Sequence, residues 1–198
     1  MLERFLRTFS AEEAVAPTSH LTPAALQRGL GGVVFGGGLL RVHTAESARE
    51  ADKYLAAGFP EFSGRIHTFA FDWLGRQFSL DPTRGDYDDP GILMFEPGTA
   101  EALEIPTTFS RFFDEELVDE PDAALALQFY RDWLDSGGPA PGFAKCVGYR
   151  TPLFLGGTDD VANLEVLDIG VYLGLTAELR QRTRGLPVGD RIKGLTIS

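Results

Sequence analysis

The chain has 198 residues, of which 43% are hydrophobic and 24% charged, and its formal net charge is −11. This length allows one large or two small domains with a sizeable core, and the composition excludes an intrinsically disordered chain. The acidic charge opposes direct binding of nucleic acid or of an anionic membrane, and the single cysteine, Cys146, excludes an intrachain disulfide or a cysteine-rich metal site.

The N-terminus MLERFLRTFS lacks the apolar core of a secretory signal. No run of the sequence approaches the roughly 20 apolar residues that span a bilayer. Together with the single cysteine, these features predict a cytoplasmic protein that does not enter a membrane.

The N-terminal part is predicted to contain helices and short strands. Helices are expected over Leu2–Phe9 and Pro23–Leu30, and the second is preceded by a capping threonine and opened by proline. The glycine-rich segment that follows contains two short apolar runs, 33–35 and 39–42, which predict strands. A further threonine then caps a helix over 45–55.

The strongest strand pattern covers residues 65–81, RIHTFAFDWLGRQFSLD, in which phenylalanines alternate with other residues on both sides of a DWLG corner. This pattern predicts a β-hairpin. Ile92–Gly98 predicts a third strand after an acidic loop, DPTRGDYDD at 81–89. The three strands together predict an antiparallel meander.

Beyond Pro106 the apolar residues recur at helical spacing. The face of a first helix is expected to carry Phe109, Phe112, Phe113 and Leu117. A second helix is expected to begin with Asp122 as its N-cap and to end at 137–139. A last helix is expected over 168–184, and its inward face should carry Val171, Leu175 and Leu179.

The order of strands followed by helices predicts an α+β fold, an antiparallel β-sheet flanked by helices. We expect a sheet-rich part with N-terminal helices at 1–105 and a helical C-terminal part at 106–198. The two parts either fold separately or form one compact unit.

No catalytic or metal-binding motif is complete in the sequence. GLGGVVFGGG has neither the register of a dinucleotide loop nor the lysine of a P-loop. His20, His43 and His67 lie far apart, and nothing near Cys146 in the sequence would activate a thiol. We therefore expect no enzymatic activity, no cofactor and no metal ion.

Acidic residues are concentrated in two short segments, the loop near residue 86 and the run DEELVDEPD. Such a surface can neutralise a basic partner and speed its capture by electrostatic steering. The residues expected to contact that partner are Asp86, Asp88, Asp89, Asp114, Glu115, Glu116, Asp119, Glu120 and Asp122.

The segment Val147–Gln181, VGYRTPLFLGGTDDVANLEVLDIGVYLGLTAELRQ, resembles the C-terminal domain of bacterial type VI secretion immunity proteins of the DNase-neutralising kind. The residues that carry this resemblance are an apolar run, a Gly-Gly pair, a polar corner, an Asn-Leu pair and the ends of a helix, namely Pro152–Leu155, Gly156, Gly157, Thr158–Asp160, Asn163, Leu164, Asp168 and Leu179. At Tyr172 the chain departs from relatives that carry histidine.

The segments Phe69–Asp81 and Ile92–Thr99 are similar to the sheet of the same family, whose N-terminal part is GAD-like, so the resemblance covers residues 31–185. It implies a protein without catalysis of its own that binds a cognate, basic antibacterial toxin in the cytoplasm. The toxin's active or DNA-binding surface would be occluded. A nuclease presents positive charge to its substrate, and an acidic protein can compete for that surface.

Two other functions remain open from the residues alone. A small-ligand-binding or regulatory domain would use a pocket beneath the segment GGVVFGGG. A hydrolase would use Asp159 or Asp160 in a crowded carboxylate site.

Overall fold

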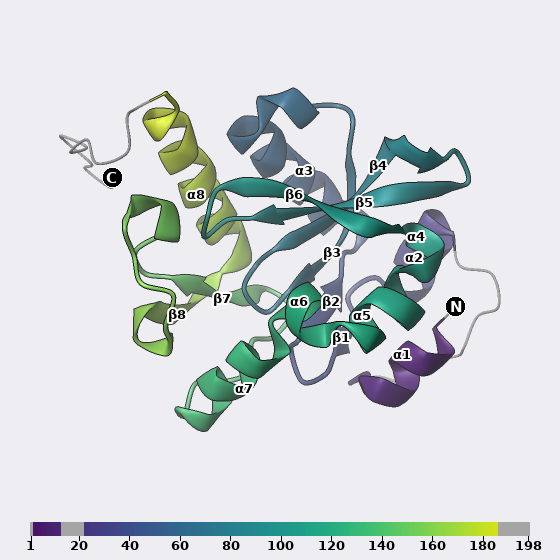
Figure 1. The fold of residues 1–198 in the computed structure, drawn as a ribbon, viewed down its shortest axis with the longest axis horizontal. Coiled ribbons are helices and arrows are strands. Elements are labelled where there is room, and N and C mark those ends of the chain that lie inside the picture. Colours follow the sequence, from purple (N-terminus) through teal and green to yellow (C-terminus); the bar gives the residue numbers. More distant parts are fainter. Residues whose placement is uncertain (1, 13–21, 186–198) are drawn as a thin grey trace.

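The computed structural model describes residues 2–12 and 22–185 (Figure 1). Its two β-sheets and surrounding helices form an α+β fold, which confirms the fold class expected from the order of the elements. In the part of the chain that the structure describes, no helix is long and apolar enough to cross a membrane. His20 lies outside the described residues.

The larger sheet is a six-stranded antiparallel meander in which each strand pairs with the next along the chain. Its strands are β1 (Val34–Phe35), β2 (Leu40–Val42), β3 (His67–Asp72), β4 (Gln77–Asp86), β5 (Asp89–Glu96) and β6 (Glu101–Thr108). The hairpin predicted around the DWLG corner is β3–β4, and the backbone N–H of Gly75 donates to the carbonyl of Asp72 at 3.0 Å, as a β-turn requires.

The acidic loop predicted at 81–89 is wrong for most of its length. β4 and β5 extend through it as a hairpin, in which Gly85 pairs with Pro90 and Asp86 with Asp89. Gly85 permits this because its φ of 76° suits a left-handed position, and an added Cβ would lie 2.5 Å from the carbonyl oxygen of Asp89. The polar sequence of this hairpin reflects its exposure beyond the core.

The helices are α1 (Glu3–Thr8), α2 (Pro23–Leu30), α3 (Ala45–Gly58), α4 (Phe109–Arg111), α5 (Leu117–Asp119), α6 (Pro121–Leu125), α7 (Leu127–Asp135) and α8 (Ile169–Thr183). The predicted caps of α2 and α3 are confirmed, because the side chains of Thr22 and Thr44 accept hydrogen bonds from the N–H groups of Ala25 and Ser47. A 3₁₀ turn, η1 (Pro60–Phe62), follows α3.

One face of the sheet packs against α1 and the helical segment after β6, and we call it the aromatic face. Phe69, Phe78 and Phe112 meet there, with ring centroids of Phe112 5.5 Å from Phe69 and 5.1 Å from Phe78. The same cluster of buried side chains extends from Leu2 to Leu164, so it includes residues on both sides of position 105.

The opposite face packs against α3, and we call it the polar face. A smaller apolar cluster covers part of it, with Leu55, Phe59, Ile66, Leu93 and Phe95. The remaining part buries hydrogen-bonded polar side chains, among them Thr68, Gln77 and Ser79.

The helical segment after β6 differs from the prediction at its interior. The expected helix over Phe109–Leu117 is divided by a π-helical turn, η2 (Phe112–Glu116). Asp122 is not an N-cap: α6 begins before it at Pro121, and the Asp122 carboxylate accepts a hydrogen bond from the N–H of Gln128 at 2.7 Å. The left-handed conformation of Ala126, with φ of 49°, separates α6 from α7.

The prediction for the inward face of α8 is confirmed at Leu179, which is buried, and wrong at Val171, which is 64% exposed. The buried side chains are Tyr172, Leu173, Thr176, Ala177 and Leu179. The reason is a close approach to α3, where an added Cβ on Gly58 would lie 3.3 Å from Ala177.

A second, two-stranded sheet pairs β7 (Lys145–Tyr149) with β8 (Leu164–Asp168). The run Pro152–Leu155 is not a strand, because it contributes to the 3₁₀ turn η3 (Leu153–Leu155), and a second turn, η4 (Val161–Asn163), precedes β8. The corner between them is held by the Asn163 side chain, which donates to the carbonyls of Thr151 and Thr158.

Candidate interaction surface

The hairpin that carries the first acidic segment is hydrogen-bonded to the start of the helical segment that carries the second. The Asp89 carboxylate, at the start of β5, accepts hydrogen bonds of 2.7 Å each from the Thr108 hydroxyl and from the N–H and hydroxyl of Ser110. These bonds tie the β4–β5 hairpin to α4, which leads directly into the second acidic segment (Figure 1). We call the surface formed by the nine acidic residues predicted to contact a partner the acidic edge.

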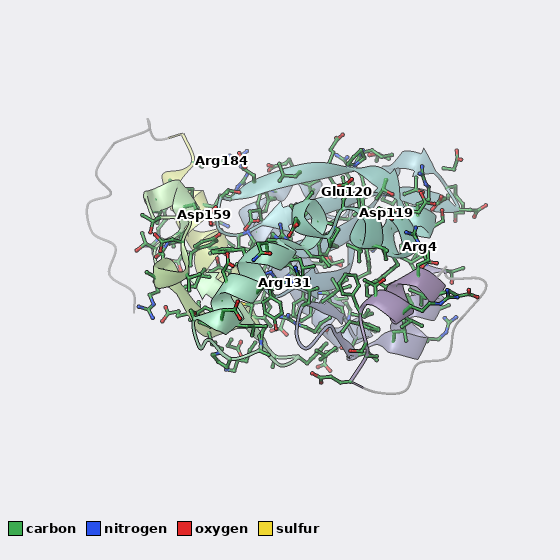
Figure 2. The ribbon with its side chains drawn as sticks, turned by 60° about the horizontal axis from the view of Figure 1, so that its bottom comes forward. Arg4, Asp119, Glu120, Arg131, Asp159 and Arg184 are labelled. Carbon is green, nitrogen blue, oxygen red and sulfur yellow. The ribbon has the colours of Figure 1, made fainter. Side chains whose placement is uncertain are left out.

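Five members of the acidic edge bind groups of their own chain, and one of them is Asp122, which accepts from the N–H of Gln128 as described above. Asp119 receives two hydrogen bonds from the Arg4 guanidinium, at 2.5 and 3.1 Å, and Figure 2 shows Arg4 beside Asp119 and Glu120. Glu115 pairs with Arg111 at 2.6 Å, and the Asp114 carboxylate accepts a hydrogen bond from the N–H of Phe5. With Asp89, these residues anchor α1 and the hairpin to the helical segment.

Burial opposes ionisation of Asp89, but the hydrogen bonds from Thr108 and Ser110 outweigh it, so its pKa lies below the ordinary value. Hydrogen bonding to Arg4 likewise lowers the pKa of Asp119. Both carboxylates are therefore anions that their own neighbours already satisfy.

The other members carry the charge available to a partner. In the described part of the chain, Asp86, Asp88, Glu116 and Glu120 have no ion-pair partner. Partial burial and the neighbouring charge of Glu120 raise the pKa of Glu116. A cation placed there would relieve repulsion between like charges.

Tyr87 also lies on this surface, but it is not among the residues predicted from the sequence. It lies at the turn of the β4–β5 hairpin between Asp86 and Asp88, and it is 95% exposed. Tyrosine at the centre of a contact surface contributes strongly to binding energy. The signal in the sequence was an aromatic residue inside an otherwise acidic turn.

The glycine-rich connection between β1 and β2 is closely packed. Gly36, Gly37 and Gly38 all have positive φ, and an added Cβ on Gly38 would lie 2.6 Å from the carbonyl oxygen of Pro141. Tyr130 donates its hydroxyl hydrogen to the carbonyl of Gly37 at 2.5 Å. The glycines are needed for this turn and close approach.

The candidate catalytic side chains are either hydrogen-bonded within the fold or buried. Asp159 accepts a hydrogen bond from the Tyr149 hydroxyl at 2.6 Å, and Asp160 caps η4 through the N–H of Asn163. Cys146 is fully buried, which raises the pKa of its thiol to about 12. Within the described ranges no group of three or more His, Cys, Asp or Glu side chains could hold a metal ion.

A buried ionic cluster lies at the DWLG corner. The Arg76 guanidinium is 2.5 Å from Asp72 and 3.8 Å from Glu96, and it also donates to the carbonyl of Ala124. Asp72 is the closer partner, and burial raises the pKa of Glu96 to about 7. The cluster links the sheet to α6.

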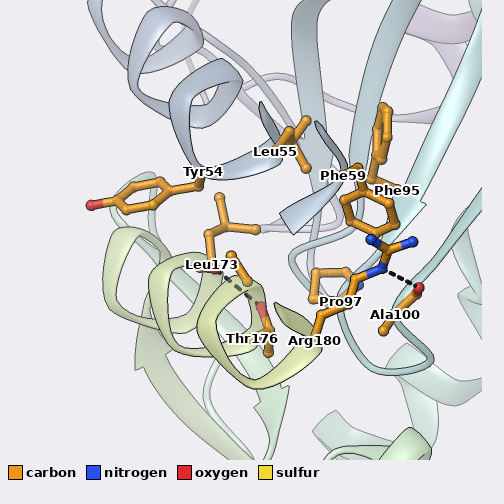
Figure 3. A pocket seen from close by; sticks show the side chains of 10 residues that line it. Tyr54, Leu55, Phe59, Phe95, Pro97, Ala100, Leu173, Thr176 and Arg180 are labelled. Carbon is orange, nitrogen blue, oxygen red and sulfur yellow. Dashed lines mark hydrogen bonds between the residues drawn. The ribbon is translucent and has the colours of Figure 1, made fainter. Parts of the chain in front are cut away.

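A small cavity between α3 and α8 is shown in Figure 3. Its volume of about 20 Å³ suffices for about one water molecule. Arg180 closes it, with its guanidinium 3.9 Å from the centre of the Phe59 ring and its Nε donating to the carbonyl of Ala100 at 3.0 Å. The residues around this cavity connect α3 and α8 to the sheet.

No family model and no curated protein matches the sequence. Among solved structures, the chain is similar to the crystal structure of Atu4351 from Agrobacterium tumefaciens, with a TM-score of 0.57 and 14% sequence identity. The match covers 90% of this chain and 89% of that chain. At this identity it shows a shared fold along nearly the whole length of both proteins.

Proposed function

We propose that the protein is an immunity protein that binds a cognate antibacterial toxin, a nuclease effector of type VI secretion, in the cytoplasm. The acidic edge contacts the toxin and occludes its active or DNA-binding surface. The observation that supports this proposal is the bond network of Asp89 with Thr108 and Ser110, which ties the hairpin of the first acidic segment to the helical segment that carries the second.

Electrostatic complementarity between the acidic edge and a nuclease surface supports this proposal. A nuclease surface that binds phosphates must be positively charged, and the carboxylates of Asp86, Asp88, Glu116 and Glu120 present the opposite sign. The exposed ring of Tyr87, flanked by Asp86 and Asp88, supplies apolar contact area at the end of the same surface.

The test is co-purification of the full chain with the toxin encoded beside its gene, in low salt at about micromolar concentration. We expect a stable complex that inhibits the nuclease. The quadruple variant Asp86→Lys/Asp88→Lys/Glu116→Lys/Glu120→Lys should lose it. Absence of a complex with the unaltered chain would overturn the proposal.

A matched control reverses exposed acidic residues elsewhere. Glu101→Lys/Asp135→Lys lies outside the acidic edge, at the start of β6 and the end of α7. Its affinity for the toxin should stay close to that of the unaltered chain, whereas Asp86→Lys/Asp88→Lys makes the same change in charge and weakens binding. Equal losses in the two double variants would remove the acidic edge from the interface.

A further inference from the structure

A second and larger cavity lies on the polar face, where α3 meets the N-terminal end of α8. Its volume is about 220 Å³. This exceeds the roughly 150 Å³ of a cavity that holds benzene, and it is below the roughly 300 Å³ at which drug-sized sites begin. It therefore suits a ligand about the size of one amino-acid side chain.

The floor of this cavity is hydrogen-bonded and uncharged. Gln77 donates its amide hydrogen to the carbonyl of Gly75 and accepts at its Oε1, 2.9 Å from His43 Nε2, so Nε2 carries the proton. The other ring nitrogen, Nδ1, then accepts from the Ser47 hydroxyl at 2.9 Å. Burial lowers the pKa of His43 to about 4, which keeps the imidazole neutral near pH 7.

The rim carries two carboxylates, Glu50 and Asp168. Glu50 lies 3.5 Å from the Tyr54 hydroxyl, and an added Cβ on Gly170 would lie 3.4 Å from Asp168 Oδ1 and 3.7 Å from the same hydroxyl. Burial and the charges of both carboxylates raise the pKa of Tyr54. Among the described residues that line the cavity, none is lysine or arginine.

The walls are aromatic. Phe71 and Phe143 meet edge to face at 5.7 Å between ring centres, and Tyr54 stands at the rim. Arg41 already lies against Phe71, with its guanidinium 4.4 Å from the ring centre. A ligand's positive charge is therefore better placed near Tyr54 and Phe143, with its apolar part against Phe71.

The nearest competing cation is Lys145, whose Nζ lies 3.9 Å from Asp168. Both side chains are about half exposed, and an exposed ion pair of this length contributes little. A ligand can displace it without a large cost.

We propose that this cavity binds a small organic cation, an alkylguanidinium or alkylammonium ion. Its charged head lies between Glu50 and Asp168, and its apolar stem points toward Phe71 and His43. The planar guanidinium offers paired donors that carboxylates accept well. The site is separate from the acidic edge, and its binding of a small cation can be measured without the toxin.

Calorimetric titration of the full chain with n-butylguanidinium tests the proposal, and n-butylurea serves as a neutral compound of similar shape. We expect binding of the cation with a Kd of about 1 mM or tighter and binding of the urea about tenfold weaker. No binding of the cation, or equal binding of the two compounds, would overturn it.

Two variants distinguish the contribution of the rim charges from that of the open volume of the cavity. Asp168 caps α8 by accepting from the N–H groups of Gly170 and Val171, and asparagine can do the same. Glu50→Gln/Asp168→Asn therefore removes both charges, and binding should fall about tenfold with little change in Tm. Gly170→Leu fills the rim and should abolish binding. The control Glu46→Gln/Asp135→Asn makes the same change in charge outside the cavity and should bind like the unaltered chain; a loss equal to that of Glu50→Gln/Asp168→Asn would refute a local role for the rim.

Ammonium and guanidinium groups occur on free small molecules and on the lysine and arginine side chains of proteins. A second titration distinguishes these two sources. The complex with the toxin is titrated with n-butylguanidinium at concentrations that saturate the cavity. Dissociation of the complex shows that the toxin supplies the cation, and an unchanged complex shows a free ligand.

Discussion

The two faces of the six-stranded sheet are built from alternating residues of the same strands, yet they differ in chemistry. On β4, Phe78 points to the aromatic face, while Gln77 and Ser79 are buried on the polar face. The aromatic face is filled by rings in contact with one another, whereas the polar face combines a smaller apolar cluster with directed hydrogen bonds. The first arrangement supplies stability, and the second positions groups around a cavity.

The polar face needs these hydrogen bonds because α3 brings its own polar side chains onto it. Asp52 accepts hydrogen bonds from the N–H and the hydroxyl of Thr68 at 3.0 and 2.6 Å, and Thr68 in turn contacts the Ser79 hydroxyl at 2.7 Å. These hydrogen bonds fix the orientation of the polar side chains, and the cavity of about 220 Å³ lies on the same face.

The largest expected effect is the loss of stability caused by a substitution in the aromatic face. Phe112→Ala removes a fully buried ring that contacts three other phenylalanines, and it should lower the free energy of unfolding by about 3–5 kcal/mol. Ser79→Ala on the polar face should cost only about 1 kcal/mol. Urea unfolding measures both, and similar losses would contradict the contrast between the faces.

Two buried titratable groups make stability depend on pH, Glu96 in the ionic cluster at the DWLG corner and His43 on the polar face. The pKa of Glu96 is raised from 4.5 to about 7, so the folded state holds a proton that the unfolded chain lacks, and stability falls as pH rises through this interval. The pKa of His43 is lowered from 6.5 to about 4, so the unfolded chain holds the extra proton and stability rises with pH between these values. The two effects oppose each other.

Glu96→Gln removes one of these opposing effects. Relative to the unaltered chain, the variant should gain stability progressively from pH 4.5 to 7, on the order of 2 kcal/mol at the upper end. Unfolding curves at several pH values give this difference, in which all other groups cancel. A difference that is flat with pH would show that Glu96 titrates as it does in the unfolded chain.

The dependence of binding on salt concentration should differ between the acidic edge and the cavity. The carboxylates of Asp86 and Asp88 are exposed, so Asp86→Lys/Asp88→Lys should weaken the toxin complex about tenfold, mainly by slowing association, and the loss should shrink at high salt. Binding of n-butylguanidinium in the partly enclosed cavity should depend less on salt. Stopped-flow and calorimetric measurements at two salt concentrations compare them, and equal salt dependence would contradict the distinction.

The smallest effect on stability is expected at Tyr87. Because its side chain is almost fully exposed, Tyr87→Ala should change the free energy of unfolding by no more than about 0.5 kcal/mol. Its loss of toxin binding should exceed about 1 kcal/mol if the hairpin turn lies inside the interface. Unchanged affinity would place the turn outside the interface.

Much of the fold could be predicted because its elements carry local patterns. The helix caps at Thr22 and Thr44 and the β3–β4 hairpin depend on neighbours in the sequence. β6 was not predicted, because it is an edge strand with half-exposed residues and Pro106, and it lacks apolar alternation. Ala126 gave no signal, since only tertiary contacts hold alanine in a left-handed conformation.

The candidate surfaces were predictable only in part. The acidic residues were visible as runs, but the link between the elements that carry them depends on Asp89 and Ser110, which are far apart in the sequence. The cavity on the polar face joins His43, Glu50 and Asp168, and nothing local in the sequence links the first two to the last.

The contact between Arg4 and Asp119 has a consequence for the N-terminus. α1 has six residues, and an isolated helix of that length is not stable in water. Its helical state therefore depends on docking through Phe5 and on the Arg4–Asp119 pair. Amide hydrogen exchange in these first residues becomes a reporter of the acidic edge: a ligand that takes Asp119 from Arg4 would register there as faster exchange.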